Sequence, residues 1–408
     1  MSSDYSLRFE IVSFWKRQRR DWKVIVTWRT FNRFFDRLTE QYASIYIMSL
    51  GADPVQLGSV NSIAALARTM ISVPIGWLHD KYSLRKILLT GIGLLAIVPL
   101  IYGLSPNWFM IIPAILLAQI AGRAGDCGPS CDVCLEDGDR ATGRAFCEGL
   151  TGGFSIIAPV TAASLIALLG GMNVDGIRPL YYIQFAARLT LFVFVFLQIT
   201  EIRGSNQANN KSNFVEDFGE VFKRGIAPKR WIAFWSIGTF TTSMMAPFRY
   251  PFAYEIKGAD EFIIGWMASS AVLLEALLGY YTGRLADRIG RKKIFYVMTP
   301  LFCLSNLLLV LSPSPLVLIL SGALSAFRML IHFVVEGVMR AELVPIDCIG
   351  RWRAILLLFG GLTSIPAPFL GGIFWRLDPS YVFLIPTSIE LLIRVPLLAT
   401  IPETRQMR

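Results

Sequence analysis

Apolar stretches of about 20 residues recur along the whole chain and alternate with short polar or charged segments. An α-helix of that length spans the roughly 30 Å of hydrocarbon in a bilayer. The pattern predicts twelve transmembrane helices and an all-α, polytopic membrane protein. The expected ranges are 25–50, 55–79, 86–104, 107–135, 143–170, 178–200, 231–256, 261–283, 293–311, 315–343, 350–375 and 380–401.

The composition agrees with a membrane location. The chain has 408 residues, of which 54% are hydrophobic and 17% charged, and its mean hydropathy is +0.53. A water-soluble protein of this length could not bury so much apolar material. Residues 1–24 are charged and lack an apolar core followed by a small-residue cleavage site, so we expect no signal peptide but an amphipathic segment at the cytoplasmic membrane surface.

Basic residues account for the net charge of +10, and they gather in alternate loops. Clusters lie within 16–23, 81–86, 140–144, 211–230, 288–293 and 351–353. A surface that binds nucleic acid would not skip every second loop, so we expect no nucleic-acid partner. The positive-inside rule predicts cytoplasmic termini in a multi-pass protein of the cell (plasma) membrane.

The chain repeats itself at an offset of 207 residues. Gly51, Gly58, Asp80, Arg144 and Pro159 recur as Gly258, Gly265, Asp287, Arg351 and Pro366 (258 − 51 = 207). The repeat predicts two pseudo-symmetric six-helix halves in the same orientation, related by an axis along the membrane normal. The halves are expected at 25–200 and 231–401, with a cytoplasmic linker at 201–230 and a tail at 402–408.

Two loops carry a family resemblance. GRLADRIGRKK at 283–293 resembles the signature loop of the major facilitator superfamily between its eighth and ninth helices, and GWLHDKYSLRK at 76–86 is a weaker copy with Ser83 in place of glycine. IPETR at 401–405 is similar to the ending of sugar-type members. The resemblance implies a secondary transporter that works by alternating access, with helices 1, 4, 7 and 10 around a central cavity. We expect it to act as a monomer.

The resemblance also implies a cytoplasmic gate. We expect it to centre on Asp80, Arg85, Asp287, Arg291 and Glu403, whose ion pairs form in one access state and break in the other. The alternative is that these charges only determine topology.

Ionisable residues inside the expected spans point to the transport path, because each costs about 2.5–3.5 kcal/mol at a helix centre. They are Asp36, Glu40, Arg68, Arg123, Asp126, Arg249, Glu275, Arg328, His332 and Glu336. Asp36 or Glu40 is a candidate proton carrier, and the alternative is a static ion pair with Arg37 or Arg68. His332 is a candidate for titration near neutral pH or for a structural hydrogen bond.

Three cysteines lie close together in the stretch DCGPSCDVC. Cys127, Cys131 and Cys134 form one stripe if the fourth helix is continuous. The stripe is either a close helix contact made of small residues or a soft-metal site, which Cys147 could approach. Arg123 and Arg328 at the same level oppose a cation. An iron–sulfur cluster and a disulfide are disfavoured, and we expect no other cofactor.

Transport of a small solute or ion is the function that these features favour. Proton-coupled export is the leading hypothesis, since the membrane acids fit proton coupling and no polar belt suited to a sugar stands out. The arginines favour uptake or exchange of an anion as an alternative, and the cysteines favour soft-metal transport. A membrane sensor with the same fold is the non-transport alternative. We expect no enzyme, because the sequence has no phosphate-binding loop or nucleophile–base arrangement.

Overall fold

A computed structural model describes residues 13–81, 83–125, 134–135, 139–200, 226–344 and 349–403. All regular structure within these residues is helical, and each expected range contains helix. The first half comprises α2 (Arg20–Thr39), α3 (Ala43–Ser49), α4 (Pro54–Lys81), α5 (Leu84–Leu104), η1 (Trp108–Met110), α6 (Ile111–Ala124), α8 (Arg140–Ser155), α9 (Ala158–Leu168) and α10 (Val174–Gln198).

The second half contains more interruptions of the α-helical pattern. It comprises α12 (Ile226–Met245), η3 (Ala246–Phe248), α13 (Arg249–Pro251), η4 (Phe252–Ile256), α14 (Glu261–Ile289), α15 (Arg291–Leu311), α16 (Pro315–Leu330), η5 (Ile331–Glu336), α17 (Gly337–Glu342), α18 (Ile349–Ser364), α19 (Pro366–Leu377), α20 (Tyr381–Ile389), η7 (Glu390–Arg394) and α21 (Val395–Ala399). Three of these segments, η4, η5 and η7, are π-helical. In the described part of the chain, π-helix occurs only in this half.

Eight helical stretches among the described residues are long and apolar enough to cross a membrane, and Trp108–Ala124 is a shorter apolar helix. The expected spans 25–50, 55–79 and 231–256 are helical but are not among the eight, so the count of twelve is not reached by these criteria. The charges within α2 explain the first case, because Arg29, Arg33 and Asp36 lower its hydropathy.

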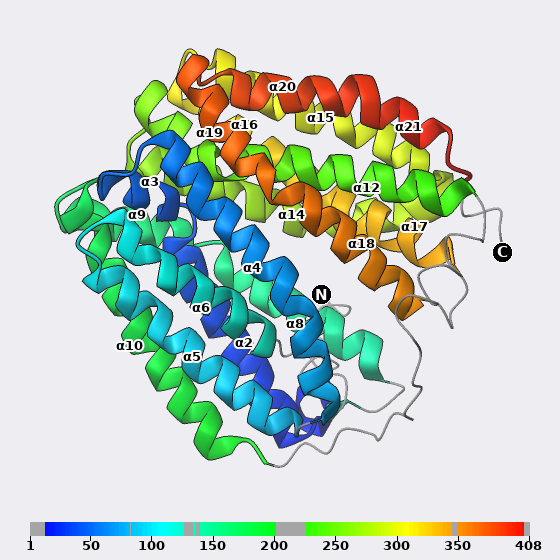
Figure 1. The fold of residues 1–408 in the computed structure, drawn as a ribbon. Helices are drawn as coiled ribbons and strands as arrows, with labels where there is room; N and C mark the ends of the chain where they lie inside the picture. The colour runs from blue at the N-terminus through cyan, green and yellow to red at the C-terminus, as the bar shows by residue number, and fades with distance from the viewer. Residues whose placement is uncertain are drawn as a thin grey trace, which may run out of the picture.

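The two halves form separate bundles that meet at one end and diverge toward the other (Figure 1). Helix α4 packs against α19, and α9 packs against α14. These pairs join the bundles beside α3, whereas the ends of α10 and α21 lie far from one another (Figure 1). The helix ends of the two halves are therefore farther apart on the side where α21 finishes.

Glycine allows the helix backbones to touch where the halves meet. A Cβ atom on Gly58 of α4 would lie 2.3 Å from the Pro368 carbonyl oxygen of α19. A Cβ atom on Gly265 of α14 would lie 2.9 Å from the Pro159 carbonyl oxygen of α9. Any larger residue would push the bundles apart at these two contacts, which the 207-residue repeat relates to each other.

Side chains add two polar links at the same end. The guanidinium of Arg376 contacts the Asp53 carboxylate at 2.8 Å, and the Ser269 hydroxyl donates to the Ile156 carbonyl at 2.7 Å. Partial burial opposes ionisation of Asp53, but hydrogen bonds from the Gln56 backbone and from Arg376 outweigh it and lower the pKa of Asp53. The pair is solvent-accessible and contributes little to stability.

Candidate functional site

A cavity of about 330 Å³ lies between the two halves. The first half contributes Arg68 of α4 and Arg123 of α6, and the second contributes Arg328 of α16 and His332 of η5. Its described lining residues include no carboxylate. The rest of the wall combines hydroxyl groups with the aromatic ring of Trp235 and other apolar side chains. The cavity is therefore positively charged and partly apolar.

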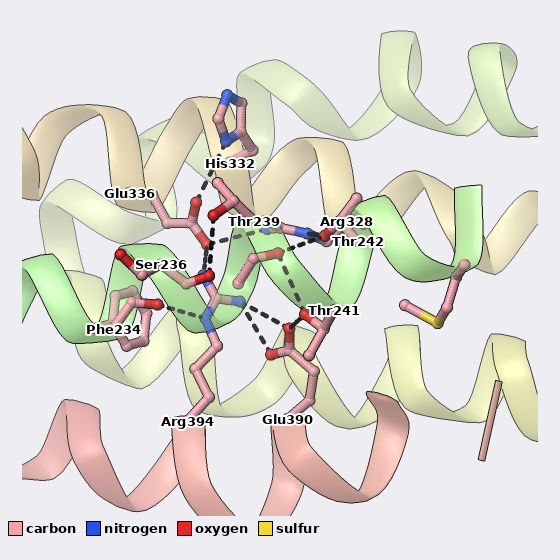
Figure 2. Close-up of polar contacts among 12 residues, drawn as sticks. Phe234, Ser236, Thr239, Thr241, Thr242, Arg328, His332, Glu336, Glu390 and Arg394 are labelled. Carbon is pink, nitrogen blue, oxygen red and sulfur yellow. Dashed lines mark hydrogen bonds and ion pairs between the residues drawn. The ribbon is translucent and has the colours of Figure 1, made fainter. Parts of the chain in front are cut away.

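A buried acid lies directly behind the arginine of the second half. The Glu336 carboxylate accepts a hydrogen bond from Nη1 of Arg328 at 3.0 Å and another from Arg394, and its other oxygen lies 3.3 Å from Nδ1 of His332 (Figure 2). The Glu336 side chain is only 1% exposed. Because Arg328, His332 and Glu336 follow one another at four-residue steps, the side chains of Arg328 and His332 both reach the Glu336 carboxylate.

The network continues away from the cavity to a second acid. Nη1 of Arg394 contacts the Glu390 carboxylate at 2.9 Å, and the Thr241 hydroxyl donates to Glu390 at 2.6 Å (Figure 2). The Arg394 guanidinium also lies 4.3 Å from the centre of the Phe234 ring. Together with Glu336 and Arg328, these residues give two arginines and two glutamates, so the buried network is electrically balanced.

His332 lies at the boundary between this network and the cavity. Its side chain is 36% exposed, whereas its partner Glu336 is buried. The imidazole packs against Trp235 with ring centres 5.4 Å apart. Both His332 and Glu336 belong to the π-helical segment η5, and π-helical turns often occur at functional sites.

Asp36 lies in the first half beside a second cavity of about 430 Å³. It forms an ion pair with Arg188 of α10, and it accepts hydrogen bonds from Asn32 at 2.9 Å and Gln184 at 3.2 Å. The partner is therefore neither Arg37 nor Arg68, the two considered from the sequence. Arg37 contacts Glu40 instead, at 3.3 Å.

The other ionisable residues that the sequence singled out belong neither to the Glu336 network nor to the contacts of Asp36. Nε of Arg68 donates to the Gln119 side chain at 3.0 Å. Arg249 is bound by uncharged groups, with Nη2 donating to the Ser305 hydroxyl at 2.8 Å. Glu275 is half-buried and has no hydrogen bond or ion pair with another described residue that the structure records. Asp126 lies outside the described residues.

Contacts of the signature loop in the second half connect the ends of α14, α15 and α17. Gly290, between α14 and α15, has φ +103°, a conformation that favours glycine. Arg291 contacts Glu342 at the end of α17 and lies 3.6 Å from Asp287. The Glu403 carboxylate accepts from the Arg291 backbone N–H at 3.3 Å. All these contacts lie within the second half.

The matching loop of the first half is only partly described. The side chain of Asp80 lies outside the described residues, and Arg85 is half-buried. Contacts of the expected gate residues can therefore be described only around Asp287 and Arg291.

Cys134 is the described member of the cysteine stripe, and it is 5% exposed. It packs in a hydrophobic cluster with Trp22, Leu135 and Cys147. Cys127 and Cys131 lie outside the described residues. The described ranges contain no group of three histidine, cysteine or acidic side chains placed to hold a metal ion. The surroundings of Cys134 are those of a packing residue, and the soft-metal site stays an untested prediction.

Sequence reasoning missed Arg188, Arg394 and Glu390. A signal for the last two was present, because they are four residues apart inside the apolar span 380–401. They were missed because the family resemblance directed the search to helices 1, 4, 7 and 10.

Two groups of known proteins resemble the chain in sequence. A putative proline/betaine transporter of Staphylococcus haemolyticus (strain JCSC1435) is 25% identical over 291 residues, which are 65% of this chain and 61% of the relative. The multidrug resistance protein MdtG of Serratia proteamaculans (strain 568) is 26% identical over 276 residues, or 63% of each protein. The aligned parts therefore span less than two thirds of these relatives.

Solved structures share the fold. The nucleoside transporter NupG superimposes with a TM-score of 0.74 at 16% identity, over 93% of this chain and 99% of that one. A POT family transporter in complex with 5-aminolevulinic acid gives a TM-score of 0.73 at 14% identity, over 94% and 96% of the two chains. Identities this low show the fold alone.

The family model of the Major Facilitator Superfamily matches residues 31–260 and 237–406, which together cover most of the chain. The helical architecture and the superimposed transporters agree with that match. The chain therefore belongs to the Major Facilitator Superfamily and is a multi-pass membrane transporter of that type.

Proposed function

We propose that the protein is a secondary active transporter of a small organic anion, which binds in the central cavity between the halves. The observation that carries this proposal is the meeting of Arg68, Arg123 and Arg328 on one cavity whose described lining has no acid. Arg328 is already balanced by Glu336, but Arg68 and Arg123 have no carboxylate partner among the described residues. An anionic substrate would supply the missing charge.

The size and the apolar part of the cavity suit an organic rather than an inorganic anion. A volume of about 330 Å³ lies at the lower end of the range of small-molecule sites. Trp235 and Phe333 offer aromatic surface beside the charged groups. The carboxylate of such a ligand would pair with the arginines, and its hydrocarbon or aromatic part would contact the apolar side chains.

The two bundles have the arrangement that alternating access requires. They contact one another at the end that holds Asp53 and Arg376, and their helix ends diverge toward the end where α21 finishes. The positive-inside pattern predicts that this second end faces the cytoplasm. In this proposal the structure is an inward-open state, and the substrate reaches the arginines from the cytoplasmic side.

His332 is the proposed link to protons. A proton bound at His332 would add a positive charge to the wall of the cavity, 3.3 Å from the Glu336 carboxylate. A proton on His332 and an anion beside Arg328 would then favour each other's binding, and this reciprocity is thermodynamically required. Export as the direction of transport stays a prediction.

Flux measurements on protein reconstituted in liposomes test the proposal. We expect uptake of aromatic and aliphatic monocarboxylates, driven by a pH gradient, and little uptake of their uncharged amides. Arg123→Gln should lower carboxylate flux at least about tenfold, as expected for loss of one charged hydrogen bond. Arg20→Gln, on the surface of α2, is the matched control and should leave flux unchanged. Equal flux of acids and amides would rule out an anion site.

A further inference from the structure

The second cavity is long and lies inside the first half. Each of α2, α5, α6 and α10 contributes one stripe of residues to it. The lining includes Arg33, Asp36 and Thr39 of α2 and continues through Glu40, just after that helix, to Ala43 at the start of α3. Its volume of about 430 Å³ falls in the range of small-molecule sites.

A polar wall separates this cavity from the central one. Gln119 of α6 lines the second cavity, whereas Arg123, one turn further along the same helix, lines the central cavity. Nε of Arg68, also in the central cavity, donates to Gln119 at 3.0 Å, so a hydrogen bond joins residues that line the two cavities. The two cavities share no described lining residue, so a ligand of the second cavity would not occupy the anion site.

The second cavity contains buried polar groups that lack partners. The hydroxyl of Tyr181 has no hydrogen-bond partner, although the residue is only 3% exposed. Nε of Arg188, a residue that is 9% exposed, is also without a partner. Buried polar groups are nearly always hydrogen-bonded, because an unpaired one costs free energy. Two such groups on one cavity indicate that a polar ligand completes it.

The charges of the wall indicate what kind of ligand fits. Two arginines, Arg33 and Arg188, face two acids, Asp36 and Glu40, so the lining has no net charge. Asp36 is already occupied by its partners on α10 and α2. Arg33 and Glu40 are exposed, and Glu40, the C-cap of α2, lies about 10.5 Å from Arg33 along the helix axis. One oxygen of Glu40 contacts Arg37 at 3.3 Å.

The tyrosine lies at the Glu40 end of the cavity. Helices α2 and α10 run in opposite directions, and Gln184 accepts from Thr39 at 3.2 Å. Tyr181 precedes Gln184 by about one turn, and its ring lies 4.9 Å from that of Tyr46, beyond Glu40 along the chain. The free Tyr181 hydroxyl and the Glu40 carboxylate thus both belong to the lining of the second cavity.

We propose that the second cavity is a binding site for an extended zwitterion. Its ammonium group would donate to Glu40 and to the Tyr181 hydroxyl, and its carboxylate would pair with Arg33 toward the opposite end. A net-neutral ligand with well-separated charges matches a lining with no net charge. An α-amino acid is too short to reach both ends, whereas an ω-amino acid is long enough. This inference does not depend on the anion proposed for the central cavity.

Calorimetric titration of the purified full-length protein tests the site with 6-aminohexanoate as the probe. Hexanoate and hexylamine each lack one of its charges, and glycine has both charges close together. We expect 6-aminohexanoate to bind at least about tenfold more tightly than hexylamine or glycine, because each charged contact contributes that much. Hexanoate is a ligand of the central cavity in the anion proposal, and we expect it not to displace 6-aminohexanoate. Equal binding of hexylamine or glycine, displacement by hexanoate, or absence of 6-aminohexanoate binding would overturn the proposal.

Variants locate the binding. Tyr181→Phe, Arg33→Gln and Glu40→Gln should each weaken 6-aminohexanoate binding about tenfold. Tyr181→Phe removes a hydroxyl that has no partner, so unfolding temperature should be retained and binding remains measurable. The matched control is Arg29→Gln on the same helix, where Arg29 pairs with Glu148 away from the cavity. Unchanged binding in Tyr181→Phe and Glu40→Gln would contradict the site.

The central cavity provides the test of independence. Arg123→Gln should lower carboxylate flux and leave 6-aminohexanoate binding as it is. Failure of the anion proposal would show as unchanged flux in that variant, and failure of the zwitterion site would show as unchanged titrations in Tyr181→Phe. A joint loss of both properties in Arg123→Gln would overturn the separation of the two cavities.

Discussion

The last membrane span of each half carries an arginine in its interior, and these two arginines have opposite surroundings. Arg188 of α10 and Arg394 of η7 lie 206 positions apart (394 − 188). Arg188 and its partner Asp36 have side chains that are 10% and 27% exposed beside the second cavity. Arg394 and Glu336 are 2% and 1% exposed. Nearly equivalent positions thus support a solvent-accessible pair in one half and a dry network in the other.

The difference follows from one neighbouring residue. Gln184 and Glu390 are also 206 positions apart (390 − 184), so the first half has an amide where the second has an acid. The acid lets Arg394 bind two carboxylates and balance Arg328 at the same time. The network of the second half can be buried without water, because its charges balance. The Asp36–Arg188 pair is balanced too, but Nε of Arg188 and the nearby Tyr181 hydroxyl lack partners, so water or a ligand can satisfy them. Unsatisfied hydrogen-bonding groups therefore distinguish the half that has room for a ligand.

The largest effect should come from removing the arginine of the dry network. Arg394→Met leaves Glu336 and Glu390 buried with too little positive charge, which should lower the free energy of unfolding by about 3–5 kcal/mol. Thermal unfolding in detergent measures the loss. Adding Glu390→Gln to the variant should recover much of it, because Arg328 then balances Glu336. A single variant as stable as the double variant would show that the network is not balanced by charge.

A smaller loss should follow from removing one hydrogen bond at the edge of this network. Thr241→Val keeps the side-chain shape but deletes the hydroxyl that donates to Glu390 at 2.6 Å. A hydrogen bond to a charged group contributes about 1.5–3 kcal/mol. The same unfolding assay checks the value. Thr242→Val, on the adjacent position, would test whether the loss depends on Glu390, because Thr242 accepts from Arg328 instead.

The corresponding change in the first half should cost less. Arg188→Met leaves Asp36 with hydrogen bonds from Asn32 and Gln184 and with access to the second cavity. We expect a loss of about 1 kcal/mol, after discounting for solvent. A cost equal to that of Arg394→Met would remove the contrast between the two halves.

The smallest expected effect is a local loss of stability in the first half at low pH. The side chain of Gln18 donates to Asp139 at 3.0 Å, and this hydrogen bond, followed by the charge of Arg17, lowers the pKa of Asp139. A carboxyl group with a lowered folded-state pKa stabilises the fold above its ordinary value of 3.8, and that contribution is lost as the pH falls through the folded-state pKa. Acidification should therefore expose residues 13–19 to hydrogen exchange first, and Asp139→Asn should remove this step.

The sequence predicted the all-helical fold because a membrane-spanning helix can be recognised from the local run of apolar residues alone. The alignment of Arg328, His332 and Glu336 was also predictable, since residues four positions apart share a helix face. The pairing of Asp36 with Arg188 was not, because it depends on how α2 packs against α10. The network around Arg394 has the same origin: contacts between distant helices are determined by packing and not by spacing.

The glycine contacts between α4 and α19 and between α9 and α14 also have a mechanical consequence. They form a compact fulcrum at one end, and α4 with its 28 residues extends about 42 Å away from it. A rotation of one bundle by about 10° around this fulcrum would move the far end of such a helix by about 7 Å. Small changes in backbone packing at Gly58 and Gly265 would thus be amplified into the opening or closing of the wide end.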